Sequence, residues 1–434
     1  MAVLQRHFLV KHCEVKIHLI EEAKLVEHTS DHAYAIFEEQ QKNRGINMDV
    51  VKQKIKSLKI ETPSWGYGDS GTRFKVFKKV GIPRNPFEKI DDAAVVHRLT
   101  GACPSVAIHI PWDYVDNFES LKEHALANNM KIGAVNPNLF QDDDYMLGSV
   151  TNANASIRRK AINHLLECID IMKEVDSQYL SLWFADGTNY PGQAHFRQRK
   201  HWMLEALQET YQALSPDMKM LIEYKFFEPG FYHTDLADWG MAYNLSNQLG
   251  EQALVLVDTG HHAPGTNVEH IVSYLIDEEK LGGFHFNSRK YADDDLIVGA
   301  INPYELFLIF YQILDAGQDR NPKVQQVADG ISYMIDQSHA IEPKIPAMIR
   351  SVLNIQTQYA KALLINLSEV KEFQSKNDVL GAEDAVRKAF EMDVTPLLQT
   401  VREEQGAPAE PMQAFYQSGY QETINKRGVG GSSW

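Results

Sequence analysis

Eight short runs rich in β-branched and aromatic residues recur along the middle of the chain, and their spacing restricts its fold most. The runs lie roughly 25–50 residues apart, and apolar residues at helical spacing fill most of the gaps. This rhythm indicates repeated βα units rather than an all-β sandwich. The predicted strands are Ile60–Trp65, Val106–Trp112, Ile132–Asn136, Tyr179–Phe184, Met220–Phe227, Leu254–Asp258, Gly283–Asn287 and Tyr333–Asp336.

Eight such units predict a closed parallel sheet, the (β/α)8 or TIM barrel, whose active sites lie at the C-terminal ends of the strands. A doubly wound open sheet has the same rhythm and stays open as an alternative. Helices are predicted in the gaps at Asn154–Val175, Arg199–Leu214 and Val268–Leu275. The expected fold class is therefore α/β, a (β/α)8 barrel with N-terminal helices and a C-terminal helical extension.

The strand signal is confined to the middle of the chain, which predicts three regions. Residues 1–58 form an N-terminal helical segment, residues 59–345 the catalytic barrel, and residues 346–434 a C-terminal helical extension with a flexible tail. Within the extension, Ile349–Ile365 and Ala382–Val401 are predicted helices. The glycine-rich end, RGVGGSSW, predicts a mobile tail.

The charge balance excludes one class of partner. The 434 residues carry 58 acidic and 43 basic side chains, a formal net charge of −15. Nucleic-acid binding needs clustered Lys and Arg, so we expect no nucleic-acid partner. No apolar run approaches the ~20 residues that span a bilayer, and no secretory signal begins the chain, so we expect a cytoplasmic protein without a membrane partner. Three scattered cysteines exclude a disulfide framework.

One predicted strand carries two opposite charges on the same face. Glu223 and Lys225 lie two residues apart, so both side chains point to one side of the strand. If that side is the barrel interior, the pair is buried, which is costly unless the charges serve a function. A solvated pair on an edge strand is the alternative.

Three further strands place carboxylates or imidazoles at or near their ends. Such strand ends converge in a barrel, and four consecutive strands with this placement predict a site with oxygen and nitrogen ligands for one or two metal ions. This ligand set suits Mn²⁺, Mg²⁺ or Co²⁺ better than a structural zinc. The residues are Glu223, Asp258, His261, His285, Asp293, Asp295 and Asp336.

The first half of the barrel contributes aromatic strand ends. His109 and Trp112 follow the second strand, Trp65 ends the first, and Trp183 lies at the end of the fourth. A single tryptophan is more often core than ligand-facing, but the coincidence with strand ends indicates a binding wall. Aromatic walls beside a metal suit a polyol, whose C–H faces pack on indoles.

A glycine pattern that fits a dinucleotide-binding motif is weighed against its context. Gly66, Gly68 and Gly71 fit G-x-G-x-x-G after a strand. The motif requires a helix to begin there, but a basic segment interrupted by Pro83 and Pro86 follows. We therefore predict a loop at this position.

Taken together, seven segments resemble the L-rhamnose isomerases, most closely the bacterial branch with broad specificity. They occur in the order of that family, and the resemblance covers nearly the whole chain, being weakest in the first ~50 residues and the tail. The segments are PSWGYGDSGTRF (63–74), HIPWD (109–113), WFADGTNYPGQ (183–193), EYKFFEPGFY (223–232), VDTGHHAPGTN (257–267), GGFHFNSRKYADDD (282–295) and MIDQSH (334–339).

The resemblance implies a barrel of the xylose isomerase type, a homotetramer and two divalent metal ions, typically Mn²⁺, with Co²⁺, Mg²⁺ or Zn²⁺ as alternatives. It implies a structural metal held by Glu223, Asp258, His285 and Asp336, and a catalytic metal held by His261, Asp293 and Asp295. The implied catalytic residues are Lys225, His109 and Asp336. Those implied to bind the substrate are Trp65, Trp112, Trp183 and Phe74, the last on a loop that reaches a neighbouring subunit in relatives.

Two departures from the family pattern are visible. Ser288 and Arg289 stand where relatives usually have an Asp followed by Ser or another residue, which changes the charge of that loop. The N-terminus is also longer than in those relatives.

We therefore expect an aldose–ketose isomerase that interconverts L-rhamnose and L-rhamnulose, and also D-allose and D-psicose, by a hydride shift assisted by two metals. An enediol route is the rival mechanism. The alternative functions are a metal-dependent phosphodiesterase or endonuclease on the same barrel, a related sugar epimerase, and an inactive sugar-binding protein.

Overall fold

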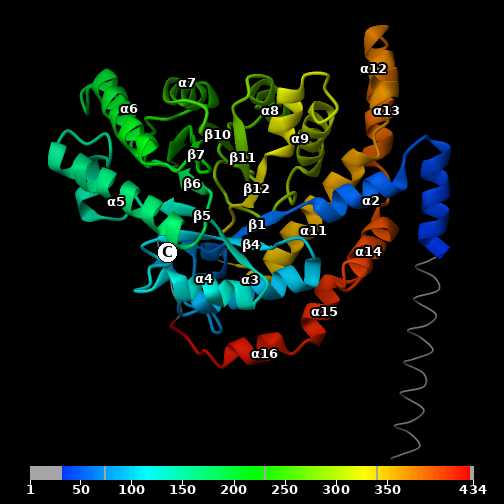
Figure 1. Ribbon diagram of the computed structural model, residues 1–434, viewed down its shortest axis with the longest axis horizontal. Coiled ribbons are helices and arrows are strands. Elements are labelled where there is room, and N and C mark those ends of the chain that lie inside the picture. Colours follow the sequence, from blue (N-terminus) through cyan, green and yellow to red (C-terminus); the bar gives the residue numbers. More distant parts are fainter. Residues whose placement is uncertain (1–31, 73–74, 229–230, 339–340, 431–434) are drawn as a thin grey trace, which may run out of the picture.

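The computed structural model describes residues 32–72, 75–228, 231–338 and 341–430, and within them eight parallel strands close into a barrel (Figure 1). The strand order is β1-β12-β11-β10-β7-β6-β5-β4, and β1 pairs with both β12 and β4. This closure confirms the predicted (β/α)8 barrel, and the alternative of an open sheet is wrong. The strands are β1 (Ile60–Pro63), β4 (Ser105–Ile110), β5 (Lys131–Pro137), β6 (Tyr179–Leu182), β7 (Lys219–Glu223), β10 (Ala253–Asp258), β11 (Leu281–Phe286) and β12 (Ser332–Ile335).

Helices surround the barrel, and most of them begin at an Asn or Asp whose side chain caps the first turn. Asn154, for example, accepts a hydrogen bond from the Ser156 amide at the start of α5. The apolar face predicted for α5 is buried, since Leu165 and Met172 are fully covered. No helix in the described ranges is long and apolar enough to cross a membrane. The helices are α3 (Pro86–Thr100), α4 (Phe118–Ala127), α5 (Ala155–Glu174), α6 (Phe196–Gln212), α7 (Trp239–Leu249), α8 (Val268–Asp277), α9 (Pro303–Ala316), α10 (Pro322–Asp329) and α11 (Lys344–Leu363).

Further helices lie outside the βα repeats. At the N-terminal side they are residues 32–43 and α2 (Met48–Ser57). Figure 1 shows α12 and α13 projecting from the barrel, while α14, α15 and α16 (orange to red) run along one side of it. The C-terminal helices are α12 (Leu367–Ser375), α13 (Val379–Phe390), α14 (Thr395–Glu404), α15 (Pro411–Gln417) and α16 (Tyr420–Asn425).

Two expectations for the C-terminal extension differ from the structure. The single helix predicted over Ala382–Val401 is wrong, because the chain breaks between α13 and α14, and Pro396 stands in the first turn of α14. Residues 427–429, expected in the mobile tail, pair with the body of the protein, whereas residues 431–434 lie outside the described ranges.

The barrel interior is packed below its C-terminal end. A layer of small and aliphatic side chains fills the middle. Toward the N-terminal end, the buried Glu61 carboxylate accepts hydrogen bonds from Ser105 Oγ and the Ala134 amide, both at 2.9 Å. A Cβ at Gly133 would lie 1.5 Å from Glu61 Oε2, so only glycine leaves room for this carboxylate. The residues of the middle layer are Ala107, Ala134, Leu221, Leu256 and Met334.

Two hairpins that the sequence did not predict stand in loops at the C-terminal end of the barrel. They are β2 (Gly71–Thr72) with β3 (Lys75–Val76), and β8 (Phe227–Glu228) with β9 (Tyr232–His233). The glycine pattern after β1 begins in a short 3₁₀ turn over Ser64–Tyr67 and ends at Gly71, the first residue of the first hairpin. No α-helix begins there, which confirms the predicted loop. The loops place polar residues around the strand ends.

Candidate metal centre

Four predicted ligands converge at the C-terminal end of the barrel. Glu223 ends β7, Asp258 ends β10, His285 lies in β11, and Asp336 directly follows β12. Each offers one ligand atom, and these four atoms lie within 4.8 Å of one another. All but Asp336, which is partly exposed, are buried. The solvated Glu/Lys alternative for β7 is wrong, because Glu223 and Lys225 are both buried inside the barrel.

The imidazole of His285 shows that this cluster fits a metal ion. Its Nδ1 is buried, lies 3.1 Å from Glu223 Oε2 and 3.7 Å from Asp336 Oδ2, and has no well-oriented hydrogen bond to a described group. A buried polar atom in this state is costly. A divalent cation among these atoms would use the nitrogen lone pair and offset the carboxylate charges. The oxygen and nitrogen donors are those that Mn²⁺, Co²⁺ or Zn²⁺ accept in proteins.

Neighbouring side chains orient two of the carboxylates. Asn287 Nδ2 donates to both oxygens of Asp258 at 3.0 Å, and the Gly260 amide donates to Oδ1 at 2.6 Å. Trp65 Nε1 donates to Asp336 Oδ1 at 2.8 Å. Such partners fix ligand orientation and support metal affinity. Asn287 was not predicted as a site residue. The signal that could have found it is its position two residues after the predicted ligand His285, on the same face of the strand.

The second predicted ligand set lies beside the first. His261 Nδ1 is 3.0 Å from the Tyr224 carbonyl, and its Nε2 is 2.9 Å from Asp293 Oδ1. Nδ1 also lies 3.1 Å from Glu223 Oε1, so His261 stands between the carboxylates of the two sets. Within the described residues, however, only the first set brings ligand atoms together within 4.8 Å. A second metal held by His261, Asp293 and Asp295 stays a prediction.

The backbone is strained at both aspartates of the second set. Asp293 has φ 51° and Asp295 has φ 46°, the left-handed region that non-glycine residues rarely adopt. Aspartate tolerates it better than most residues. Strain of this kind clusters at functional sites, where surrounding structure holds it.

The carboxylates and imidazoles of the centre perturb one another strongly. Burial alone would raise the pKa of Glu223, but the charges of His285 and His261 hold it below its usual range. Burial raises the pKa of Asp295 well above its usual value, with further contributions from Asp293 and Asp336. Burial opposes protonation of His285, yet Glu223 raises its pKa to about 9. Without a cation the His285 imidazole is therefore charged at neutral pH, and a bound divalent ion would displace its proton.

Lys225 remains an ammonium at the edge of the centre. Its Nζ donates to Glu228 Oε2 at 2.7 Å, contacts Asp293, and lies 4.9 Å from the centre of the Trp183 ring. Burial lowers its pKa, but the charges of Asp293 and Glu228 outweigh burial and raise the pKa above its usual value. Lys225 is therefore a proton donor and a positive charge, not a base.

An aromatic wall faces the centre from the first half of the barrel. His109 stacks on Trp112 with ring centroids 3.8 Å apart, and Trp65 meets His109 edge-on at 5.6 Å. Phe140, in the loop after β5, contacts Trp183 at 5.0 Å. Phe140 was not predicted, since it lies in a polar loop rather than at a strand end. Phe74 lies outside the described residues.

Two buried nitrogen atoms in this wall have no hydrogen-bond partner among the described groups: His109 Nδ1 and Trp183 Nε1. Burial lowers the pKa of His109 well below its usual value, so the imidazole is neutral. A small ligand with hydroxyl groups would satisfy such atoms, which is the chemistry of a polyol site.

No family model matches the chain. A probable sugar isomerase of Rhizobium meliloti (strain 1021) is 41% identical over 388 residues, which cover 88% of this chain and 89% of the relative. A probable sugar isomerase of Mesorhizobium japonicum is 40% identical over 398 residues, covering 90% and 91%. The chain belongs to this family of probable sugar isomerases. The structure of 3-keto-D-glucoside 4-epimerase from E. coli superposes on this chain with a TM-score of 0.50 at 13% sequence identity. The match covers 69% of this chain and 100% of the epimerase chain, which shows a shared fold.

In this family member, the side chain of the unusual Arg289 is paired with groups other than the predicted ligands. The Arg289 guanidinium donates to the Thr259 carbonyl. It also donates, at 3.1 Å, to Oε1 of Glu305, which lies on α9. Arg289 thus braces the segment that follows Asp258 from outside the barrel. Its charge is paired there and does not enter the centre directly.

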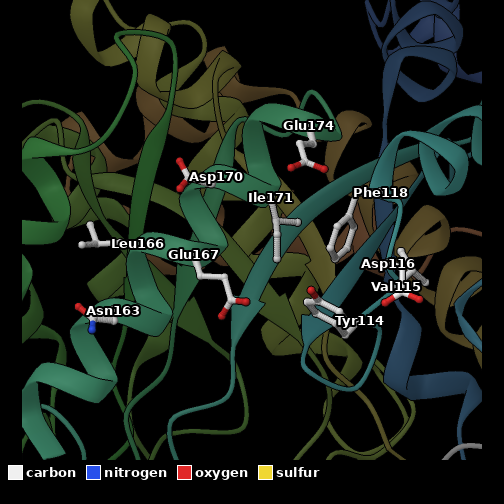
Figure 2. A pocket seen from close by; sticks show the side chains of 10 residues that line it. All are labelled: Tyr114, Val115, Asp116, Phe118, Asn163, Leu166, Glu167, Asp170, Ile171 and Glu174. Atoms are coloured by element: carbon white, nitrogen blue, oxygen red, sulfur yellow. The ribbon is translucent and has the colours of Figure 1, made fainter.

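The protein also has an acidic groove on its surface, away from the candidate centre. The groove has a volume of about 450 Å³ and lies between α5 and the segment before α4 (Figure 2). Carboxylates of Asp116, Glu167, Asp170 and Glu174 line it. None of the predicted site residues lies in it, so the groove is separate from the candidate centre.

Proposed function

We propose that the protein is an aldose–ketose isomerase that interconverts L-rhamnose and L-rhamnulose, with D-allose and D-psicose as a second pair. The observation that carries the proposal is the strand-end cluster around the buried His285 Nδ1, which has no hydrogen-bond partner among the described groups. Membership in a family of probable sugar isomerases supports a sugar as the substrate.

We propose two divalent ions, Mn²⁺ by preference. One would be held by Glu223, Asp258, His285 and Asp336, the other by His261, Asp293 and Asp295. When bound, such ions polarise a carbonyl and stabilise negative charge on neighbouring oxygens. The site residues that surround them would bind and orient the sugar.

Each remaining side chain has a role in this proposal. Lys225 would donate a hydrogen bond to the charge that develops on sugar O1 or O2, and its raised pKa keeps it protonated. Asp336 would orient a water molecule near the O2 hydroxyl, with its other oxygen held by Trp65. The neutral His109 imidazole would hydrogen bond a sugar hydroxyl, and the indoles of Trp112 and Trp183 would pack on C–H groups.

The hydrogen would move directly between C1 and C2 as a hydride. In the rival enediol route a base takes the C2 proton and exchanges it with solvent. Turnover in D₂O distinguishes them, because a hydride shift leaves no solvent deuterium at C1 of the product. Deuterium at C1 would refute the hydride shift and leave the isomerase proposal intact.

A ketose assay on L-rhamnose and D-allose tests the function. We expect turnover with Mn²⁺ and none after EDTA treatment, restored by added Mn²⁺. The double variant Asp293→Ala/Asp295→Ala should abolish turnover. Asp294→Ala is the matched control, because Asp294 accepts hydrogen bonds from the Lys290 and Tyr291 amides and belongs to neither ligand set. Conversion of ketoses into other ketoses without any turnover of aldoses would refute the proposal in favour of an epimerase.

We also propose that the chain forms a homotetramer, in keeping with the family resemblance. Light scattering of the purified protein should give four times the mass of the chain. A monomer at the concentrations used for the activity assay would contradict this.

A further inference from the structure

A single buried carboxylate joins two neighbouring strand ends of the barrel. It belongs to Asp113, which lies in the turn after β4 and is fully buried. Its Oδ2 accepts hydrogen bonds from the Ser64 hydroxyl and, at 2.8 Å, from the His109 amide. Its Oδ1 accepts from Lys89 Nζ on α3 at 2.6 Å. Because Ser64 directly follows β1, and β1 pairs with β4, Asp113 ties the ends of these two strands together.

The two strand ends that Asp113 joins carry the aromatic wall. Ser64 is followed directly by Trp65, and the turn from His109 to Asp113 contains Trp112. This turn is closed by a hydrogen bond from the Asp113 amide to the His109 carbonyl at 2.8 Å. Trp65 meets His109 edge-on with ring centroids 5.6 Å apart, and His109 stacks on Trp112 at 3.8 Å. The rings that contact one another therefore stand on the two backbone segments that Asp113 joins.

The same rings connect the wall to the candidate centre. Trp65 Nε1 donates to Oδ1 of the predicted ligand Asp336 at 2.8 Å. His109 contributes a buried Nδ1 that has no hydrogen-bond partner among the described groups. A shift of the end of β1 relative to the end of β4 would move the Trp65 ring, beside the ligand, away from the His109 ring. The bond between the two strand ends thus sets the width of the wall next to the centre.

The contacts at this position require both oxygens of a carboxylate. Lys89 donates to one oxygen, while the Ser64 hydroxyl and the His109 amide donate to the other. An asparagine has only one acceptor oxygen, and its NH2 group would face one of these donors. The Lys89 side chain is 4% exposed, and its ammonium compensates the buried negative charge. The pair therefore adds no net charge behind the wall.

We propose that Asp113 is a positioning residue for sugar binding, because it holds Trp65 against the ring stack of His109 and so fixes the shape of the aromatic wall. The effect on sugar binding rests on the proposed isomerase function. The effect on the wall rests only on the contacts of Asp113. Ring contacts with the C–H groups of a sugar are made alike in the ground state and the transition state, so a displaced wall weakens binding more than it slows the chemical step.

Two serines provide a matched test, since each donates a hydrogen bond to a buried carboxylate between β1 and β4. Ser64→Ala removes the bond to Asp113 at the end of the barrel that carries the candidate centre. Ser105→Ala is the control, because it removes the bond from β4 to Glu61 of β1 at the opposite end. Asp113→Asn is the stronger variant, since it also disturbs the contact with the His109 amide. For each protein we would measure KM and kcat for L-rhamnose at saturating Mn²⁺, and hydrogen–deuterium exchange of residues 64–68 and 109–114.

We expect Ser64→Ala to raise KM about five- to tenfold, as for the loss of one hydrogen bond to a charged group, and to leave kcat within about threefold. Exchange should increase in both segments, because the bond that joins them is lost. Asp113→Asn should raise KM further. Ser105→Ala should leave KM, kcat and the exchange of both segments unchanged.

The two readouts decide the two parts of the proposal separately. An unchanged KM in Ser64→Ala while exchange rises would refute the effect on sugar binding, and unchanged exchange would refute the effect on the wall. An equal rise in KM in Ser105→Ala would also refute it, because general loosening of the two strands would then be the cause. If Asp113→Asn does not fold, Ser64→Ala and its control still decide the outcome. If the unmodified protein turns over no aldose, the proposed function fails, and the exchange data still decide whether Asp113 holds the strand ends together.

Discussion

Replacing Asn287 by alanine should weaken metal binding without removing a ligand. Asn287 Nδ2 donates to both Asp258 oxygens at 3.0 Å, and the side chain is 4% exposed. Without it, Asp258 keeps the Gly260 amide as its hydrogen-bond donor among the groups that the structure describes. The carboxylate would then turn more freely. Its pKa, which burial already raises to about 7, would rise further, so that an ion must displace a more tightly held proton.

The size of this effect follows from the contacts that are lost. A hydrogen bond to a charged group contributes about 1.5–3 kcal/mol, and the two contacts share one amide group, so we count them as one such bond. Since a tenfold change in Kd corresponds to about 1.4 kcal/mol, we expect the affinity for Mn²⁺ to fall about 10–100-fold. The fold should remain intact, because the substitution leaves the barrel ladder unchanged.

Competition titration of the metal-free protein with Mn²⁺ against a chelator measures this affinity. Asn136→Ala is the matched control, since Asn136 is also a buried asparagine near a strand end, 6% exposed, and donates to the Ile108 carbonyl at 3.1 Å rather than to a ligand. The control should keep its Mn²⁺ affinity within about threefold. An equal affinity in Asn287→Ala and the unmodified protein would refute the reasoning.

Three other predictions follow from the same geometry. Lys225→Met should lower kcat/KM for L-rhamnose by about 10²–10³-fold with the Mn²⁺ content unchanged, because the charged donor is lost, and an unaltered kcat/KM would contradict its role. In EDTA, the free energy of unfolding by urea should fall between pH 6.5 and 9. The pKa of His285 is raised to about 9, so its contribution to stability is complete below the ordinary imidazole pKa and is lost as the pH passes 9. A free energy of unfolding that rises over this range would contradict the prediction. Gly133→Ala should lower the unfolding free energy by about 1–3 kcal/mol, since its Cβ would overlap Glu61 Oε2, and an unchanged urea midpoint would show that the Glu61 side chain can move aside.

The barrel strands could be predicted because their buried segments are apolar, and the predicted segments overlap the observed strands. The residues at which the strands end could not be predicted. The strand predicted over Met220–Phe227 ends at Glu223, and Phe227 instead begins the short hairpin β8–β9. The strand predicted to reach Trp65 stops at Pro63, since proline cannot donate to the ladder. Periodicity indicates that a strand exists, whereas the residue at which it leaves the sheet depends on contacts in the site.

The ligands of the centre could be anticipated because parallel strand ends converge in a barrel. The groups that orient them could not, because an amide such as Asn287 acquires its role only from its distance to Asp258 on the neighbouring strand. The last residues that the structure describes show the same limit. Their glycine-rich composition indicates mobility, but Arg427 pairs with Asp92, 335 residues earlier in the chain. No local pattern marks such a pair.

The packed floor of the barrel closes the candidate centre on the side of the strand N-termini. The packed middle layer and the Glu61 carboxylate beneath it fill the interior on the side away from the loops. Sugar, product, water and the protons displaced by a cation must all use the loop side. An unbranched polymer cannot thread through a barrel whose interior is packed below the centre. Entry and exit therefore compete, and slow release of product would block the next substrate directly.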